Sequence, residues 1–489
     1  MSKEPNLYLP ESDVHWNDVK PYIDREPEKD YPRASESARE AFNDMKFGVR
    51  IHWGLYSEWH LQEESWPFLK MSDEDRQTYQ DLYKTFDPKG FDADQWLSFF
   101  KEAGFKCFAF TTKHHDGFSL FDTDTKVKRR VNWIAPGGPQ IEACDISYSV
   151  ADSPFKRDIV GELCDAARKY DIKIDLYFSH PDWFDADFRP YTFHPLSVPD
   201  LEKVITQREL DEMDVRFDTR SPLLVHSITK DEKERMVARH RQQLTELLTK
   251  YGQIDMICLD MWLGADVWPE LRDTIKKLRD IQPDVMIRAR GIGNYGDYYC
   301  PEGFVPECKE NTDMPWMVIY PLAETFSYDP IDAHYKGSEW VINNLIDTVA
   351  KGGNFMVGIG PDGAGCWHPK AVEQLLDAGK WLDVNGEAIY ATRPRPGMLY
   401  KEGDDIYYTC SKDGAFVYAI STKWPGSSLC LTTVRPKEGT PINLLGFDAD
   451  LKWNYDDNDG KLLIHIPEQL QNENHRPCKT AYAFKIAVE

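Results

Sequence analysis

The stretch "RDIVGELCDAARKYDIKIDLYFS", Arg157 to Ser179, joins two different hydrophobic patterns without a break. Its first part repeats apolar side chains at helical spacing, at Ile159, Leu163, Ala166 and Tyr170. Basic residues near its end suit the negative end of a helix dipole. Its second part, "IKIDLYFS", is a short run rich in β-branched and aromatic residues, which is typical of a strand. The stretch therefore predicts a helix that leads directly into a strand.

The same alternation extends on both sides of this stretch. Helix patterns around "DADQWLSFFKEAG" and "VARHRQQLTELLTKYG" end at Gly104 and Gly252. The predicted strands are residues 47–53, 106–112, 172–179, 255–260, 285–290 and 354–360. Short buried strands separated by helices indicate a parallel sheet. We predict an α/β fold, a (β/α)8-like (TIM) barrel, with a doubly wound sheet as the alternative.

The pattern changes near residue 395. "DIYYTCSKDGAFVYAIS" and "LKWNYDDNDGKLLIHIP" each place two alternating runs around an Asp-Gly turn, and "TAYAFKIAV" alternates to the end. Such runs are typical of antiparallel hairpins. The predicted domains are a catalytic barrel with an N-terminal extension over residues 1–394 and a smaller antiparallel β-sandwich over residues 395–489.

Composition excludes several classes of partner. Acidic residues number 82 against 58 basic ones, for a formal charge of −24, so a nucleic-acid partner is not expected. No apolar run reaches the ~18 to 20 residues of a membrane span. The N-terminal "MSKEPNLYLPESD" lacks the apolar segment of a secretory signal. We expect a cytoplasmic protein, or a secreted or periplasmic one if a signal has been removed.

In a barrel of this kind, residues at the carboxyl ends of the strands form the active site. The residues in those positions are His52, Trp53, His114, His115, Asp116, Tyr177, Asp260 and Arg290. A metal site built from the histidines and Asp260 is one hypothesis, and structural hydrogen bonding is a second. The third hypothesis is that these residues bind a ligand rich in hydroxyl groups. Because adjacent residues of a strand face opposite ways, His114 and His115 would need a bulge to share one metal ion.

Several motifs together resemble the α-L-fucosidases of glycoside hydrolase family 29. They are "KFGVRIHWGLYS", "TTKHHDGFSLFDT", "IDMICLDM", "GDYYCPE" and the run from "VAKGGNFMVGIGPDG" to "NGEAIYATRP". The resemblance covers about residues 46–394. It implies a barrel followed by a β-sandwich and a retaining mechanism without metal or cofactor. It also implies an oligosaccharide or glycoconjugate substrate, while a homo-oligomeric state is left open.

The resemblance assigns roles to individual residues. It makes Asp260 the nucleophile and Glu302, in "GDYYCPE", the acid/base, with Glu307, Glu310 and Glu324 as rivals for the second role. The implied sugar-binding residues are His52, Trp53, His114, His115, Tyr177, Arg290 and Phe326. The family's Glu-Trp pair is interrupted here by Ser65 in "EESW", which leaves Glu64 and Trp66 as its counterparts.

Several residues depart from the family pattern in the sugar pocket, among them Arg288, Ala289 and Met317. Arg50 replaces a usual aromatic residue, and Cys258 replaces a usual tryptophan. Arg50 alternates with His52 along the strand and is expected on the same side. It either pairs with a protein acid, with Glu324 the first candidate, or contacts a larger, polar C5 substituent of the sugar.

The expected activity is hydrolysis of α-L-fucosides or of closely related L-galacto-configured glycosides. Two alternatives remain. One is a catalytically impaired carbohydrate-binding protein on the same scaffold, and the other is a metal-dependent hydrolase that uses the histidine cluster.

Overall fold

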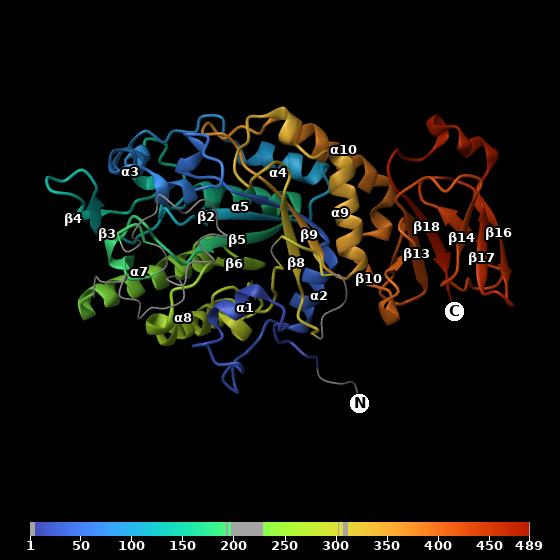
Figure 1. Cartoon of the computed structure of the whole chain (residues 1–489), viewed down its shortest axis with the longest axis horizontal. Helices are drawn as coiled ribbons and strands as arrows, with labels where there is room; N and C mark the ends of the chain where they lie inside the picture. The colour runs from blue at the N-terminus through green and yellow to red at the C-terminus, as the bar shows by residue number, and fades with distance from the viewer. Residues whose placement is uncertain (1–4, 192–193, 197–227, 302, 307–311, 489) are drawn as a thin grey trace.

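Parallel strands form the centre of the larger domain (Figure 1). The computed structural model describes residues 5–191, 194–196, 228–301, 303–306 and 312–488. In this part of the chain, seven strands form one sheet in the order β7-β6-β5-β2-β1-β9-β8. Their bounds are β1 Phe47–Ile51, β2 Cys107–Lys113, β5 Lys173–Ser179, β6 Met256–Asp260, β7 Met286–Ile287, β8 Met317–Pro321 and β9 Asn354–Ile359. Neighbouring strands are parallel throughout.

The sheet curls into a barrel, and a short extended segment joins its two edge strands. Tyr298 forms a parallel bridge to Arg288 after β7, and Tyr299 forms one to Trp316 before β8. This segment takes the place of an eighth strand. The predicted barrel is confirmed. β8 and the Tyr298–Tyr299 segment are not among the strands that the sequence predicts, and β7 is shorter than predicted.

Helices cover the outside of the barrel (Figure 1). They are α4 Ala93–Glu102, α5 Ile159–Tyr170, α7 Lys230–Thr249, α8 Trp268–Ile281, α9 Ser338–Ala350 and α10 Pro369–Asn385. Local sequence sets several of their starts. Asp158 accepts a hydrogen bond from the Gly161 amide as the N-cap of α5, and Thr229 with Glu232 forms a capping box on α7. Strands β1, β2, β6 and β9 are buried along their whole length, because their side chains meet either the barrel interior or this helical layer.

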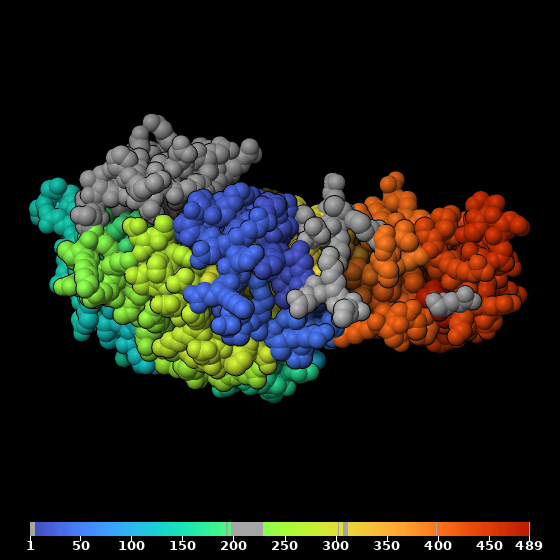
Figure 2. Space-filling model, turned by 90° about the horizontal axis from the view of Figure 1, so that it is seen from below, coloured from blue at the N-terminus to red at the C-terminus, as the bar shows by residue number. Residues whose placement is uncertain are grey.

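The N-terminal segment lies against the barrel beside the turn that follows β7 (Figure 2). It contains α1 Val14–Val19 and α2 Glu36–Met45. The Leu9 amide donates to the Asn294 side chain at 2.8 Å, and Trp16 packs against Gly293. The segment therefore supports the turn directly after Arg290.

A hairpin extends from the barrel near one end of the molecule (Figure 1). Its strands are β3 Val127–Asn132 and β4 Gln140–Ile146, and they pair antiparallel. The short helix α3 Asp73–Gln80 lies in the long connection after β1. Gln80 donates to the Val131 carbonyl at 3.0 Å, so this connection is fixed to the hairpin.

The C-terminal domain is an antiparallel β-structure around its own apolar core, as predicted. The strand order is β10-β12-β13-β18-β15-β16-β17-β14, and β11 pairs with β12. The bounds are β10 Arg393–Pro394, β11 Lys401–Glu402, β12 Ile406–Cys410, β13 Phe416–Ser421, β14 Ser428–Leu431, β15 Ile442–Leu444, β16 Asp450–Asp456, β17 Lys461–His465 and β18 Tyr482–Ala487. Thus the C-terminal sheet also includes β10, which precedes residue 395.

Helix α10 connects the two domains (Figure 1). The Trp381 indole N–H donates to the Ala481 carbonyl at 3.0 Å, and the Ala483 amide donates to the Asn385 side chain at 3.3 Å. Both α10 side chains are buried. None of the helices in the described ranges combines the length and the apolar character that are needed to cross a lipid bilayer.

Candidate active site

A cavity of about 330 Å³ lies at the carboxyl ends of the barrel strands. Its lining includes most of the residues that the sequence singles out: Arg50, His52, Glu64, Trp66, His114, His115, Tyr177, Asp260, Arg290 and Phe326. The residues come from segments far apart in the chain, and the parallel sheet brings their strand ends to one edge. Glu63, Met261, Pro321, Glu324 and Thr325 complete the lining.

Asp260 is the buried carboxylate at the centre of this cavity. Arg290 donates to its Oδ1 at 2.6 Å, and the Tyr177 hydroxyl donates to its Oδ2 at 2.6 Å. Arg288 lies 3.5 Å from Oδ1 and His115 lies 3.8 Å from Oδ2. Burial alone would raise the pKa of this carboxyl, but Arg290 and Arg288 outweigh it and hold the pKa well below 3.8. Asp260 is therefore ionised at neutral pH, although it is buried.

The backbone beside Asp260 is unusual. Met261, directly after the strand, has a φ of 63°. Its carbonyl oxygen would lie 2.2 Å from a Cβ placed on Gly291, which itself has a φ of 80°. Only glycine fits there, and this close approach brings the end of β6 next to the segment that carries Arg290.

The three histidines share one wall of the cavity. The rings of His114 and His115 have centroids 4.1 Å apart, and His52 lies 5.6 Å from His114. Both histidines lie beyond the end of β2, in a turn where the Gly117 amide donates to the His114 carbonyl at 3.1 Å, so the alternation of a regular strand does not separate them. Burial lowers the pKa of His115 to about 3 and that of His114 well below 6.5, so both rings are neutral.

Neutral imidazoles can bind metal ions or hydroxyl groups. Among the described residues, no group of three or more His, Cys, Asp or Glu side chains is arranged to hold a metal ion. Each neutral ring offers one hydrogen-bond donor and one acceptor, which matches a hydroxyl group. The wall therefore suits a neutral, polyhydroxylated ligand.

The residue that interrupts the expected Glu-Trp pair has a structural role that the sequence did not reveal. Ser65 is fully buried, and its Oγ lies 2.5 Å from His114 Nδ1. Glu63 and Glu64 before it have φ values of 68° and 53°. This local left-handed backbone brings both glutamates and Trp66 to the cavity. Ser65 fixes the orientation of the His114 ring, whichever of the two atoms donates.

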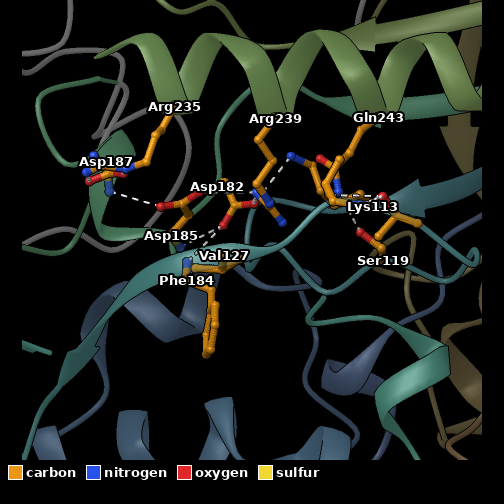
Figure 3. A network of polar contacts seen from close by, with 12 residues as sticks. Lys113, Ser119, Val127, Asp182, Phe184, Asp185, Asp187, Arg235, Arg239 and Gln243 are labelled. Atoms are coloured by element: carbon orange, nitrogen blue, oxygen red, sulfur yellow. Dashed lines mark hydrogen bonds and ion pairs between the residues drawn. The ribbon is translucent and has the colours of Figure 1, made fainter. Parts of the chain in front are cut away.

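A second layer of charged residues supports the histidine wall (Figure 3). Arg239 of α7 donates to Asp182 at 2.6 Å, and the buried Lys113 ammonium lies 3.6 Å from the same carboxylate. Asp182 also lies against Gly117, where a Cβ would approach its Oδ1 to 2.2 Å. Thus the glycine of the "KHHDG" motif makes room for the acid that holds this loop.

The same network positions an aromatic side chain that the sequence analysis missed. The Asp182 carboxylate accepts hydrogen bonds from the next amides of its own loop, at Phe184 and Asp185. The amide of Trp183, which lies between Asp182 and Phe184, donates to the His115 carbonyl at 2.7 Å. Its ring lies 5.2 Å from that of His115 and 5.4 Å from that of Trp66. Trp183 therefore backs two residues of the cavity wall.

Among the described residues to which the sequence gives a sugar-binding role, Trp53 does not line the cavity. Its ring packs against Phe86, Phe91 and Trp96, and its indole N–H donates to the Asp362 carbonyl at 3.0 Å. Because side chains alternate along an extended chain, His52 faces the barrel axis and Trp53 faces the helical layer. The structure gives Trp53 a packing role in place of the expected contact with the sugar.

The acid near Arg50 is Asp175, and Glu324, the first candidate, does not pair with it in the described part of the chain. Arg50 lines the cavity, as expected, and its guanidinium donates to the Cys258 sulfur at 2.6 Å and lies 5.2 Å above the Tyr177 ring. The carboxylate that acts on it electrostatically is Asp175. Glu324 lines the cavity too, but among the described residues no ion pair joins it to Arg50.

The predicted acid/base, Glu302, lies outside the described residues, and so do its rivals Glu307 and Glu310. The carboxyl groups that the structure does place in the cavity beside Asp260 are Glu63, Glu64 and Glu324. The role of Glu302 therefore stays a prediction from the sequence.

Both domains match known families. Residues 23–387 match the family model described as Alpha-L-fucosidase, and residues 401–487 match the model of the Alpha-L-fucosidase C-terminal domain. The chain is 30% identical over 472 residues to the tissue alpha-L-fucosidase of Homo sapiens, covering 91% of this chain and 88% of that protein. It is 29% identical over 453 residues to the tissue alpha-L-fucosidase of Bos taurus, covering 87% and 84%.

Solved structures share the architecture. Alpha-L-fucosidase isoenzyme 1 from Paenibacillus thiaminolyticus superimposes with a TM-score of 0.72 at 25% identity, over 93% of this chain and 99% of that one. A GH29 alpha-L-fucosidase from Bacteroides thetaiotaomicron, solved as a trapped covalent intermediate, gives 0.70 at 22% identity, over 95% and 100%.

The contact between Ser65 and His114 yields a testable prediction. Replacing Ser65 by alanine removes one buried hydrogen bond, worth about 0.5 to 1.5 kcal/mol. We expect kcat/KM for an aryl glycoside substrate to fall about 2- to 10-fold. Steady-state kinetics of the folded variant measure the loss.

Ser57→Ala is the matched control. Ser57 is also fully buried after β1, but its Oγ has no hydrogen-bond partner among the described residues. Equal kcat/KM values for Ser65→Ala and Ser57→Ala would contradict a role for Ser65 in orienting His114.

Proposed function

The chain belongs to the α-L-fucosidase family of glycoside hydrolases, and on that premise we propose a specific reaction for it. The protein is a retaining exo-glycosidase that hydrolyses α-L-fucosides or closely related L-galacto-configured glycosides. Its substrates are oligosaccharides or glycoconjugates that carry such a sugar at a non-reducing end. The main support for this reaction is that Asp260, a buried residue of the cavity lining, is ionised.

Asp260 has the properties that a glycosidase nucleophile needs. A nucleophilic carboxylate must be ionised at neutral pH and must face the anomeric carbon. Arg290 and Tyr177 engage its two oxygens and keep it ionised inside the barrel. In the first step, one oxygen of Asp260 forms a bond to C1 while the bond from C1 to the leaving oxygen breaks. In the second step, water attacks C1 and releases the Asp260 carboxylate, so the anomeric configuration is retained.

The second carboxyl group is proposed to be Glu302. A retaining mechanism needs a general acid that protonates the leaving oxygen and then, as a base, activates water. The two carboxyl groups of retaining enzymes are about 5 to 5.5 Å apart. Support for Glu302 comes from its place in "GDYYCPE", because the preceding Tyr298–Tyr299 segment belongs to the barrel wall.

The histidine wall supports a sugar ligand. Fucose presents hydroxyl groups that both donate and accept hydrogen bonds, and the neutral rings of His114 and His115 can meet either need. His52 adds a third imidazole to the same wall. Tyr177 and Arg290 extend this polar surface to the nucleophile. An uncharged, densely hydroxylated ring is therefore the expected occupant of the cavity.

Replacing Asp260 by glycine tests the nucleophile. We expect turnover of 4-nitrophenyl α-L-glycosides to fall below detection, because no carboxylate remains to attack C1. Added azide should enter the vacated space and yield a glycosyl azide of inverted configuration instead of the retained sugar. Product analysis by NMR and release of nitrophenol measure both outcomes.

Asp116→Asn is the control for Asp260→Gly. Asp116 is another buried acid at this end of the barrel; it accepts a hydrogen bond from Tyr79 and does not line the cavity. Burial raises its pKa to about 7, so an amide resembles its protonated form. The control should keep most of the activity. Near-normal hydrolysis by Asp260→Gly would remove Asp260 from the mechanism.

Replacing Glu302 by alanine tests the acid/base. Natural glycosides need protonation of the leaving oxygen, whereas an activated aryl glycoside needs little. We expect kcat/KM to fall about 10²- to 10⁴-fold more on a natural linkage than on the aryl substrate. Glu307→Ala and Glu310→Ala are the matched comparisons. If Glu302→Ala lowers kcat/KM equally on both substrates, Glu302 is not the acid/base. The role then belongs to Glu307 or Glu310, whichever variant loses more kcat/KM on the natural linkage than on the aryl substrate.

A further inference from the structure

A buried polar layer lies beneath the cavity, inside the barrel. Its members are Arg50 of β1, Asp175 of β5, Cys258 of β6, Arg288 after β7 and Tyr298 of the closing segment. Each is at most 5% exposed. Barrel interiors are usually filled by branched aliphatic side chains. Charged groups in this position are costly to bury. Binding of a ligand at the cavity floor, where this layer meets the cavity, would explain them.

Arg50 is the member of this layer that lines the cavity. A guanidinium group has five N–H donors. Among the described residues, Arg50 donates one hydrogen bond, to the Cys258 sulfur, and its Nε has no hydrogen-bond partner. Buried donors of this kind are nearly always satisfied, by protein, water or ligand. Arg50 can therefore donate to a ligand atom at the cavity floor.

Asp175 is the acid of this layer, and burial raises its pKa to about 7. Ala109 of β2 pairs in register with both Arg50 and Asp175, so the two charged residues are two strands apart at the same level. Both Asp175 oxygens are buried and have no hydrogen-bond partner among the described residues. This acid offsets the two arginines of the layer only in part. The cavity lining as a whole has four carboxyl groups, on Glu63, Glu64, Asp260 and Glu324, against the guanidinium groups of Arg50 and Arg290. It therefore suits a neutral polar group better than an anion.

An apolar ring lies beside the guanidinium. Gly358 of β9 is the register partner of Arg50 on the other side of β1. The Phe326 ring fills the space above this glycine, where an added Cβ would lie 2.3 Å from Phe326 Cδ1. Phe326 also lines the cavity and lies 5.5 Å from the His52 ring. One end of the cavity thus has an apolar half and a hydrogen-bonding half side by side.

We propose that Arg50 and Phe326 together recognise the C5 substituent of the sugar, and that this substituent is a hydroxymethyl group. Its methylene packs on Phe326, and its hydroxyl oxygen accepts a hydrogen bond from Arg50. The preferred substrates are then α-L-galactosides, which differ from α-L-fucosides by one oxygen on C6. This inference rests on the proposed function, because it places an L-galacto-configured sugar in the cavity.

The test compares three substrates on the wild-type protein: 4-nitrophenyl α-L-galactoside, α-L-fucoside and α-L-galacturonide. We expect kcat/KM to be highest for the galactoside, about 10- to 100-fold above the fucoside, because without the hydroxyl a buried donor stays unsatisfied. Cleavage of none of the three would contradict the proposed function itself. Cleavage of the fucoside in preference to the galactoside would overturn only the inference of a hydroxymethyl group. A preference for the galacturonide would show that the C5 substituent is an anion and not a neutral group.

Variants connect the preference to Arg50. Arg50→Leu should reduce the ratio of kcat/KM for galactoside over fucoside about 10- to 100-fold. Since this change leaves the Asp175 carboxylate without its cation, Arg50→Leu/Asp175→Asn serves as a second variant with both charges removed. The double variant should show the same loss of preference. An unchanged ratio in either folded variant would mean that Arg50 has a structural role only.

Discussion

The site depends on one buried carboxylate that stays ionised. Asp260 lies inside the barrel, where burial favours its neutral form, and two arginines with the Tyr177 hydroxyl reverse that preference. The two arginines follow β7 and Tyr177 lies in β5, so the partners come from the strands on either side of β6, and the carboxylate keeps its charge only if these strands hold their register. Gly291 allows the close approach of β6 to the segment that carries Arg290, and the N-terminal segment contacts the turn after β7. The ionised state of Asp260 thus depends directly on the arrangement of the barrel strands.

A similar logic holds the histidine wall in place. The "KHHDG" motif contributes two rings to the cavity. Its lysine lies near Asp182 (Figure 3), and its glycine leaves room for the same carboxylate. Asp182 also accepts a hydrogen bond from Arg239 of α7. The helix that follows β5 therefore stabilises the loop that follows β2, which explains why a short motif contains both ligand-facing and structural residues. Because the His114 and His115 rings stay neutral, they do not compete with the arginines as cationic partners of Asp260. Their nitrogen atoms can bind hydroxyl groups.

Much of this organisation could be predicted from the sequence, because local patterns determine it. Helix caps and apolar runs indicate the βα units, and strand ends give most of the cavity residues. The closing segment could not be predicted in this way, since Tyr298 and Tyr299 form single bridges and no apolar run. The Asp175 counter-charge depends on register across β2, which no local pattern reveals. Ser65 did have a signal: it interrupts an expected motif, and the structure shows that the interrupting residue contacts His114.

The central claim is that Asp260 forms a covalent bond to the sugar. Incubation with a 2-deoxy-2-fluoro-α-L-glycosyl fluoride, followed by proteolysis and mass spectrometry, tests it most directly, because the fluorine slows release of the intermediate. We expect one labelled peptide, with the sugar on Asp260 at the end of "DMICLD". Label on Glu63, Glu64 or Glu324, or hydrolysis of the reagent with inversion and no label, would contradict it.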